Sequence, residues 1–201
     1  MPARPACFFR VALLALVSLG LAGCTVPAAG IGAGATAGVA VAQERSVGNA
    51  LDDGVITITV SSNLLQYNID LFQAVDVEVV EGRVLLTGKV EQPDHRVQAV
   101  RLAWLADGVV EVLNEIQVTD EGGIVNYARD TWIGTQLRTK LLLDMAVRAI
   151  NYNIEVVNGV VYMIGIARDQ GELERVTNHA RTIKNVIKVV SHVRIVGAPA
   201  N

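Results

Sequence analysis

The later part of the chain alternates apolar and polar residues with the period of a helix. Ile133, Leu137 and Leu141 recur one helical turn apart, which predicts a helix with one side facing a core. Asp130 stands just before this stripe and is a residue type that helix N-caps favour. We therefore expect the helix to begin at Asp130.

Strand patterns follow this predicted helix. Residues 154–157 and 160–164 are rich in β-branched side chains, and Asn158-Gly159 between them is typical of a tight hairpin. Helical spacing returns over 172–183, and alternation over 186–195 predicts a last strand. The order is therefore helix, strand, strand, helix, strand.

The same pattern occurs earlier, 77 positions upstream and without a gap. Asp53 aligns with Asp130, and 77–80 aligns with 154–157. Further matches, listed as earlier and later positions, are Ile56 with Ile133, Leu64-Leu65 with Leu141-Leu142, Gly82 with Gly159, Gly88 with Gly165, and Val112 with Val189. A whole unit is duplicated.

Two segments of the first copy conflict with the repeat. Residues 55–60 are β-branched and alternate like a strand, but their counterpart, 132–137, is helical in pattern. We expect a helix, because tertiary context can override weak propensity. In the second helix, Val97, Val100 and Trp104 lie one step away from the positions that match the later copy, which predicts a rotated helix or a longer loop.

The N-terminal segment predicts export and lipidation. Arg4 and Arg10 supply a positively charged region before an apolar run at residues 11–22. The run has signal-peptide length, is too short to span a bilayer, and ends in Leu21-Ala22-Gly23-Cys24. That tetrad resembles the bacterial lipobox. The resemblance implies that residues 1–23 are removed and that Cys24 carries acyl (palmitate-type) chains; an ordinary secretory signal is the alternative. Thr25 in place of Asp favours, by the same resemblance, the outer membrane.

The sequence predicts six segments along the chain. The segments are a signal peptide (1–23), a lipidated Cys24 with a Gly/Ala-rich tether (24–49), a first domain (50–119), a linker (120–126), a second domain (127–197) and a tail (198–201).

Composition adds a contrast between the two copies. The whole chain of 201 residues is 51% hydrophobic and carries a net charge of −3, which argues against disorder and against a dedicated nucleic-acid binder. Residues 51–120 hold twelve acids and four Lys/Arg, a net charge of −8. Residues 127–197 hold six acids and ten Lys/Arg, a net charge of +4. An anionic bilayer therefore repels the first copy and attracts the second.

The glycine-flanked hairpins narrow the class of protein. Residues 82–88 and 159–165 both read Gly-x-Val-x-(Leu/Met)-x-Gly. Two copies of helix-strand-strand-helix-strand with this motif resemble the BON domain. The resemblance implies an α+β fold of two tandem BON domains, each with a small three-stranded mixed sheet packed against two helices.

The resemblance also implies a function. With the lipobox and the tether, the chain looks like the dual-BON outer-membrane lipoproteins, which face the periplasm, bind anionic phospholipid such as phosphatidylglycerol or cardiolipin, support envelope integrity and gather at division sites. In that family the first helix of the second domain binds the lipid. The matching residues are Trp132, Thr135, Arg138 and Leu142.

The residues themselves favour the same helix. Trp132, Thr135, Thr139 and Leu142 form a second stripe beside the core-facing one, with Arg138 next to it. Such a stripe suits the boundary between headgroups and acyl chains. Packing of Trp132 on the core or on the first domain is the alternative.

Two other functions remain possible, and the sequence carries no motif for catalysis or metal binding. A protein-interaction adaptor of the envelope and an osmotic-stress or chaperone-like module are the alternatives. His95, His179 and His192 lack the spacing of metal ligands, and no nucleophile elbow or phosphate loop occurs. We expect no enzyme activity, no cofactor, no metal, no nucleic-acid partner and a monomer.

Overall fold

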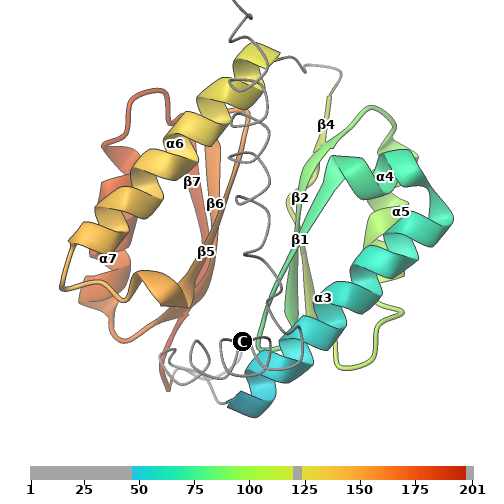
Figure 1. Ribbon diagram of the computed structural model, residues 1–201, viewed down its shortest axis with the longest axis horizontal. Helices are drawn as coiled ribbons and strands as arrows, with labels where there is room; N and C mark the ends of the chain where they lie inside the picture. The colour runs from blue at the N-terminus through green and yellow to red at the C-terminus, as the bar shows by residue number, and fades with distance from the viewer. Residues whose placement is uncertain (1–46, 120–123, 198–201) are drawn as a thin grey trace, which may run out of the picture. The chain divides into compact units, whose positions relative to one another are not determined.

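The computed structural model describes residues 47–119 and 124–197, and each range holds one copy of the repeated unit (Figure 1). The first copy consists of α3 (Val47–Tyr67), α4 (Ile69–Ala74), β1 (Val75–Val80), β2 (Arg83–Val90), α5 (Pro93–Ala103), β3 (Glu111–Asn114) and β4 (Gln117–Val118). The second consists of α6 (Ile124–Leu143), the 3-10 turn η1 (Ala149–Asn151), β5 (Tyr152–Val157), β6 (Val160–Ala167), α7 (Gln170–Arg181) and β7 (Lys188–Ile195). The predicted signal peptide, Cys24 and most of the tether lie outside the described residues.

Each copy builds one small mixed sheet. β1 pairs with β2 antiparallel, and β2 pairs with β3 parallel; β5, β6 and β7 repeat this order. In the first copy the short strand β4 also pairs with β2, beyond β3. Helices cover one face of each sheet (Figure 1). The predicted α+β fold is confirmed, with α4, η1 and β4 as additions to the expected elements.

Residues 55–60 are helical, as their counterpart in the repeat predicts and in contrast to their local strand propensity. They lie within α3, and Ile56, Val60 and Leu64 are buried in the core of the first copy. Ile133, Leu137 and Leu141 hold the equivalent places in the second core. The β-branched side chains are therefore accepted in a helix because every fourth residue meets the sheet.

The expectation of a rotated second helix in the first copy is wrong. Ala99 and Ala103 of α5 face the core, at the positions that match Val176 and Ala180 of α7. Val97 is 64% exposed and Trp104 is 52% exposed. Alanine has a short side chain and lets a helix lie close to a sheet. Val97 and Trp104 therefore point outward, whereas Val100 and Leu102 pack, partly buried, at the edge of the core.

The expectation that Asp130 begins a helix is also wrong. Helix α6 starts at Ile124, and Asp130 lies buried inside it. Its Oδ2 accepts a hydrogen bond from the Asn158 amide at 2.7 Å, and its Oδ1 accepts one from the Gly159 amide at 2.8 Å. Asp130 therefore fixes the β5–β6 hairpin to the helix.

The first copy repeats this contact. Asp53 of α3 accepts hydrogen bonds from the amides of Glu81 and Gly82 at 2.9 and 2.8 Å. Both turn residues have positive φ, 54° at Glu81 and 71° at Gly82, as a primed hairpin turn requires. The carboxylate satisfies two amides that such a turn leaves without a strand partner.

The last glycine of each hairpin motif lies where a neighbouring backbone segment leaves no room for a side chain. A Cβ on Gly165 would lie 2.1 Å from the carbonyl oxygen of Asn151, and one on Gly88 would lie 2.0 Å from that of Ala74. In both copies the backbone at the start of the first strand therefore approaches closely, which only glycine permits.

A third apolar cluster joins the two copies. It contains Val80 and Leu85 from the first sheet and Val157, Tyr162, Ile164 and Ile166 from the second. Because Leu85 lies between Val84 and Leu86 of the first core, the cluster occupies the sheet face opposite the helices. The guanidinium of Arg83 donates to the His192 carbonyl across this contact at 2.8 Å.

The apolar clusters of the described ranges do not involve the N-terminal segment. The three apolar clusters lie wholly within the described ranges, so a chain that begins at residue 25 keeps all of them. Among the helices in those ranges, none is long and apolar enough to cross a bilayer.

Candidate functional site

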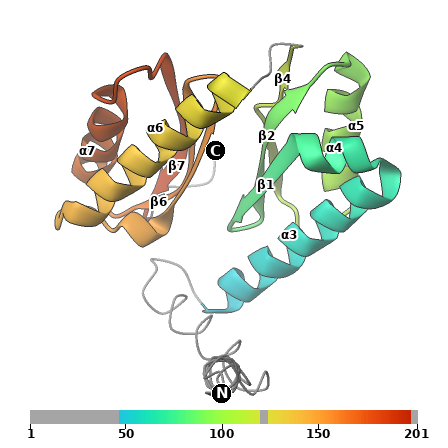
Figure 2. The ribbon, with the colours of Figure 1, turned by 45° about the horizontal axis from the view of Figure 1, so that its top comes forward.

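The outer face of α6 carries all five residues predicted to bind lipid. Trp132 is 45% exposed and Leu142 is 75% exposed, and Thr135, Arg138 and Thr139 are exposed as well. The opposite side of the same helix is buried in the second core. Figure 2 shows α6 lying along one face of its sheet. Trp132 does not pack into the core, so the two stripes of this helix are separate.

The two threonines make this face less polar than their side chains suggest. The Thr135 hydroxyl donates to the Thr131 carbonyl, and the Thr139 hydroxyl donates to the Thr135 carbonyl, each at 2.8 Å. A hydroxyl that donates its hydrogen to a carbonyl of its own helix needs no water to accept that hydrogen. The cost of moving these threonines out of bulk water is therefore reduced.

Arg138 is the basic residue within the stripe, and its charge is partly engaged. Its guanidinium donates to the Ile154 carbonyl and lies 3.4 Å from the Glu155 carboxylate. Burial, together with Asp76 and Glu78, raises the pKa of Glu155 from 4.5 to about 7, and Arg138 opposes this rise. The negative charge beside Arg138 therefore titrates near neutral pH.

The sequence reasoning missed apolar residues at both ends of the stripe. Tyr127, near the start of α6, is exposed, and so are Leu143 at its end and Met145, which is 100% exposed. The signal was present in the run Leu141-Leu142-Leu143. Helical geometry can turn only one of these three leucines fully to the core. The exposed apolar surface thus continues past Leu142 to the end of the helix.

Basic side chains from α6, from α7 and from the turn between β6 and α7 surround this apolar end. The Lys140 ammonium donates to the Thr182 hydroxyl at 3.2 Å, and the Arg168 guanidinium donates to the Ala146 carbonyl at 2.5 Å. Asp144, the nearby acid, is engaged by His179 at 2.7 Å and by Arg175 at 3.7 Å. The hydrogen bond from His179 and the Ala146 amide hold the pKa of Asp144 below its usual range. Arg168 is also paired with Glu172 at 2.9 Å. The bases near the apolar end, Lys140, Arg168 and Arg175, outnumber the acids Asp144 and Glu172 by one.

Histidines and acids do not gather into a chemical centre in the described ranges. No group of three or more His, Cys, Asp or Glu side chains there is arranged to hold a metal ion. His192 is paired with Glu115 at 2.9 Å, and His179 with Asp144. Each of these two histidines thus contacts one acid, and the His192–Glu115 pair joins the two copies.

Comparison with known proteins now places the chain in a class. The BON domain model matches residues 52–120 and 129–197, so the chain belongs to the BON-domain family and contains the domain twice.

The chain is also similar to known proteins over most of its length. The chain is 30% identical over 187 residues to "Outer membrane lipoprotein DolP" of Haemophilus influenzae, which covers 91% of this chain and 95% of that one. It is 41% identical over 146 residues to "Uncharacterized protein in gshII 5'region" of Anaplasma centrale (72% and 95%). It is 31% identical over 149 residues to "Osmotically-inducible protein Y" of Escherichia coli (72% and 73%). The chain is thus a dual-BON protein of the DolP type.

Proposed function

We propose that this chain is an outer-membrane lipoprotein, anchored through Cys24 and facing the periplasm, which binds anionic phospholipid through the outer face of α6. The residues in contact with lipid are Trp132, Thr135, Arg138, Thr139 and Leu142, extended by Leu143 and Met145. Phosphatidylglycerol and cardiolipin are the expected lipids. The protein thereby supports envelope integrity, and gathering at division sites is a further part of the proposal.

One observation carries the proposal: an exposed apolar stripe runs along the outer side of the first helix in the positively charged domain. Trp132 and Leu142 can enter the boundary between headgroups and acyl chains, where amphipathic aromatic rings are favoured. Arg138 and Lys140 can contact phosphates at the same time. The relative named an outer membrane lipoprotein supports the location.

The expected strength follows from these parts. Each cation close to an anionic surface contributes about 1 kcal/mol, and burial of a large apolar side chain contributes about 1.5–3 kcal/mol. A domain with Trp132, Leu142 and two cations therefore binds vesicles reversibly. The acyl chains on Cys24 supply the permanent anchor, because two or more chains bind a membrane stably whereas a single chain binds it only marginally. Each copy of the chain contacts the bilayer through its own α6.

The test uses the chain from residue 25 onward, without lipid. Co-sedimentation with vesicles that contain phosphatidylglycerol is compared between the unmodified chain and Trp132→Glu. We expect the substitution to weaken binding at least tenfold, because it removes the ring and adds a charge that the surface repels.

Trp104→Glu is the matched control. Trp104 is about as exposed as Trp132 but belongs to the first domain, so the same change there should leave binding within about twofold. Circular dichroism checks that both variants are folded. Equal binding by the Trp132→Glu variant and the unmodified chain would contradict the assignment of the site.

A further inference from the structure

The first domain carries a helix face that is more apolar than the one proposed to meet lipid. Leu51, Val55, Ile58 and Leu65 of α3 are all strongly exposed, and Ile58 is 72% exposed. With Ser62 they are spaced by four, three, four and three residues, which is the spacing of a coiled-coil contact. An apolar stripe of this kind is suited to packing against another helix.

A bilayer does not suit this face. Helix α3 contains neither lysine nor arginine, and its domain has a net charge of −8. An anionic surface would repel it. The occupant must instead be apolar and positively charged.

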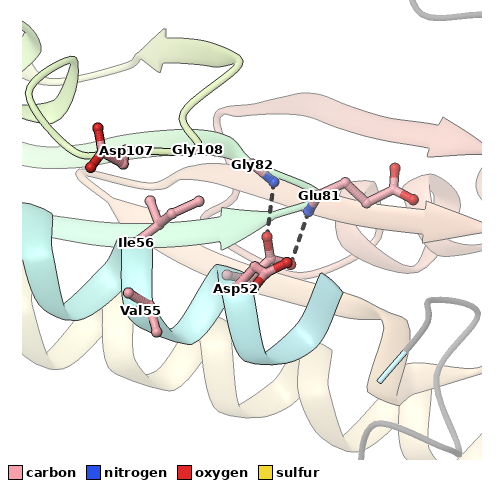
Figure 3. A pocket seen from close by; sticks show the side chains of 8 residues that line it. Asp52, Val55, Ile56, Glu81, Gly82, Asp107 and Gly108 are labelled. Atoms are coloured by element: carbon pink, nitrogen blue, oxygen red, sulfur yellow. Dashed lines mark hydrogen bonds between the residues drawn. The ribbon is translucent and has the colours of Figure 1, made fainter. Parts of the chain in front are cut away.

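Carboxylates lie at one end of the stripe. A pocket of about 450 Å³ beside Val55 is lined by Asp52 and Asp107, and also by Glu81. Figure 3 shows Asp52 and Val55 on α3, with Asp107 on the loop that follows α5. Glu81 lies 3.3 Å from Arg194, whereas Asp52 and Asp107 are exposed. The pocket can therefore accept a cationic side chain that arrives with an apolar helix.

A helix with these properties exists in this chain. The repeat aligns Val55 with Trp132, Ser62 with Thr139 and Leu65 with Leu142, so α6 presents the corresponding stripe. Arg138 and Lys140 flank it. Asp130, the one acid of α6 within the described residues, is buried. The outer face of α6 is thus apolar and cationic, and that of α3 is apolar and anionic.

We propose that α3 of one copy binds α6 of a second copy, with the two helices antiparallel. This orientation puts Arg138 and Lys140, in the later half of α6, beside the pocket that Asp52 of α3 and Asp107 of the loop after α5 line. The stripe from Leu51 to Leu65 is about 21 Å long. A contact of that length is smaller than a standard interface, so the pairing is weak and forms where anchored copies are concentrated.

Two properties follow from the use of different faces. Each pair leaves one α3 and one α6 free, so the contact continues into short chains of copies and does not stop at a dimer. Lipid and a second copy also compete for α6. This competition, unlike the pairing itself, rests on the proposed function.

Sedimentation velocity of the unlipidated chain from residue 25 tests the pairing. The sedimentation coefficient should rise with concentration up to several hundred micromolar at 50 mM NaCl, and less so at 500 mM. Ile58→Asp should remove the rise by blocking α3, and Trp132→Glu should remove it by blocking α6. Val97→Asp, an exposed apolar position on α5, is the matched control and should leave the rise unchanged.

A mixture of the two blocked variants gives the decisive result. The Ile58→Asp variant keeps its α6 face and the Trp132→Glu variant keeps its α3 face, so an equimolar mixture should form one-to-one pairs and nothing larger. A chain that stays monomeric throughout, a mixture that does not pair, or an Ile58→Asp variant that still associates would each overturn the proposal.

Lipid binding separates this proposal from the proposed function. The Ile58→Asp variant should bind phosphatidylglycerol vesicles as the unmodified chain does, because α3 is not the lipid face. If the pairing occurs but vesicles do not bind, the lipid site alone is wrong. If vesicles bind but no pairing occurs, the pairing alone is wrong.

Discussion

Replacement of Asp130 by asparagine distinguishes a helix cap from a clamp on the hairpin. An Asp-to-Asn change at a helix N-cap is nearly neutral, because both side chains accept one hydrogen bond. In the structure, Asp130 is 6% exposed and its two oxygens accept from two different amides, those of Asn158 and Gly159. Asparagine has one acceptor oxygen, and its NH₂ group would face a second donor.

The expected cost is substantial. The substitution removes one charge-assisted hydrogen bond and leaves one buried amide without a partner, which costs about 1–3 kcal/mol. The remaining bond loses the benefit of the negative charge. We therefore expect Asp130→Asn to lower the free energy of unfolding of the second domain by about 2–4 kcal/mol.

Urea denaturation measures this change. In a Trp104→Phe background, Trp132 is the single tryptophan and reports on the second domain. Asp169→Asn is the matched control, because Asp169 is a true N-cap whose side chain accepts from the Glu172 amide. The control should cost a few tenths of a kcal/mol. A cost below about 0.5 kcal/mol at Asp130 would refute the clamp.

Four further predictions concern the charge of Glu155, the space at Gly165 and the anchor at Cys24. Glu155→Gln should stabilise the protein at pH 8 by up to about 3 kcal/mol but should not stabilise it at pH 4. The reason is that folding raises the pKa of Glu155 from 4.5 to about 7, so its ionised form becomes destabilising as the pH rises through that interval. Denaturation at both pH values measures the change. The same titration should make vesicle binding stronger at pH 6 than at pH 8, and only in the chain with Glu155. Gly165→Ala should destabilise by about 3 kcal/mol, since its Cβ would meet the Asn151 carbonyl, whereas Gly54→Ala meets nothing and should be neutral or stabilising by thermal denaturation. Cys24→Ser should move the protein from the membrane to the soluble fraction on cell fractionation.

Local patterns predicted the second domain better than the first. Asn158-Gly159 and the stripe of Ile133, Leu137 and Leu141 identify a hairpin and a core face directly. Residues 55–60 could be assigned to a helix only through their counterpart in the repeat.

Two features could not be predicted from local pattern. In α5 the core positions are Ala99 and Ala103, and hydrophobicity alone selects the larger Val97 and Trp104, which are exposed. Asp130 binds amides 28 and 29 residues away, a distance at which propensity carries no information. The first error concerns packing between elements, and the second concerns both the start of α6 and its packing on the hairpin.

The candidate site was predictable to the extent that it depends on one helix. The stripe from Trp132 to Leu142 is set by helical geometry, so its residues could be named from their spacing. Met145 lies after the helix, and the involvement of Glu155 with Arg138 depends on how β5 packs against α6. The spacing of residues along α6 predicts neither the exposed Met145 nor the contact between Glu155 and Arg138.

The fluorescence of Trp132 on anionic vesicles tests the central claim most directly. In the Trp104→Phe variant of the unlipidated chain, phosphatidylglycerol vesicles should shift the emission of Trp132 to shorter wavelength, and lipids with brominated acyl chains should quench it. Vesicles of zwitterionic lipid alone should do neither. An emission spectrum that stays unchanged while the protein sediments with the vesicles would show that another face binds, and would contradict the account.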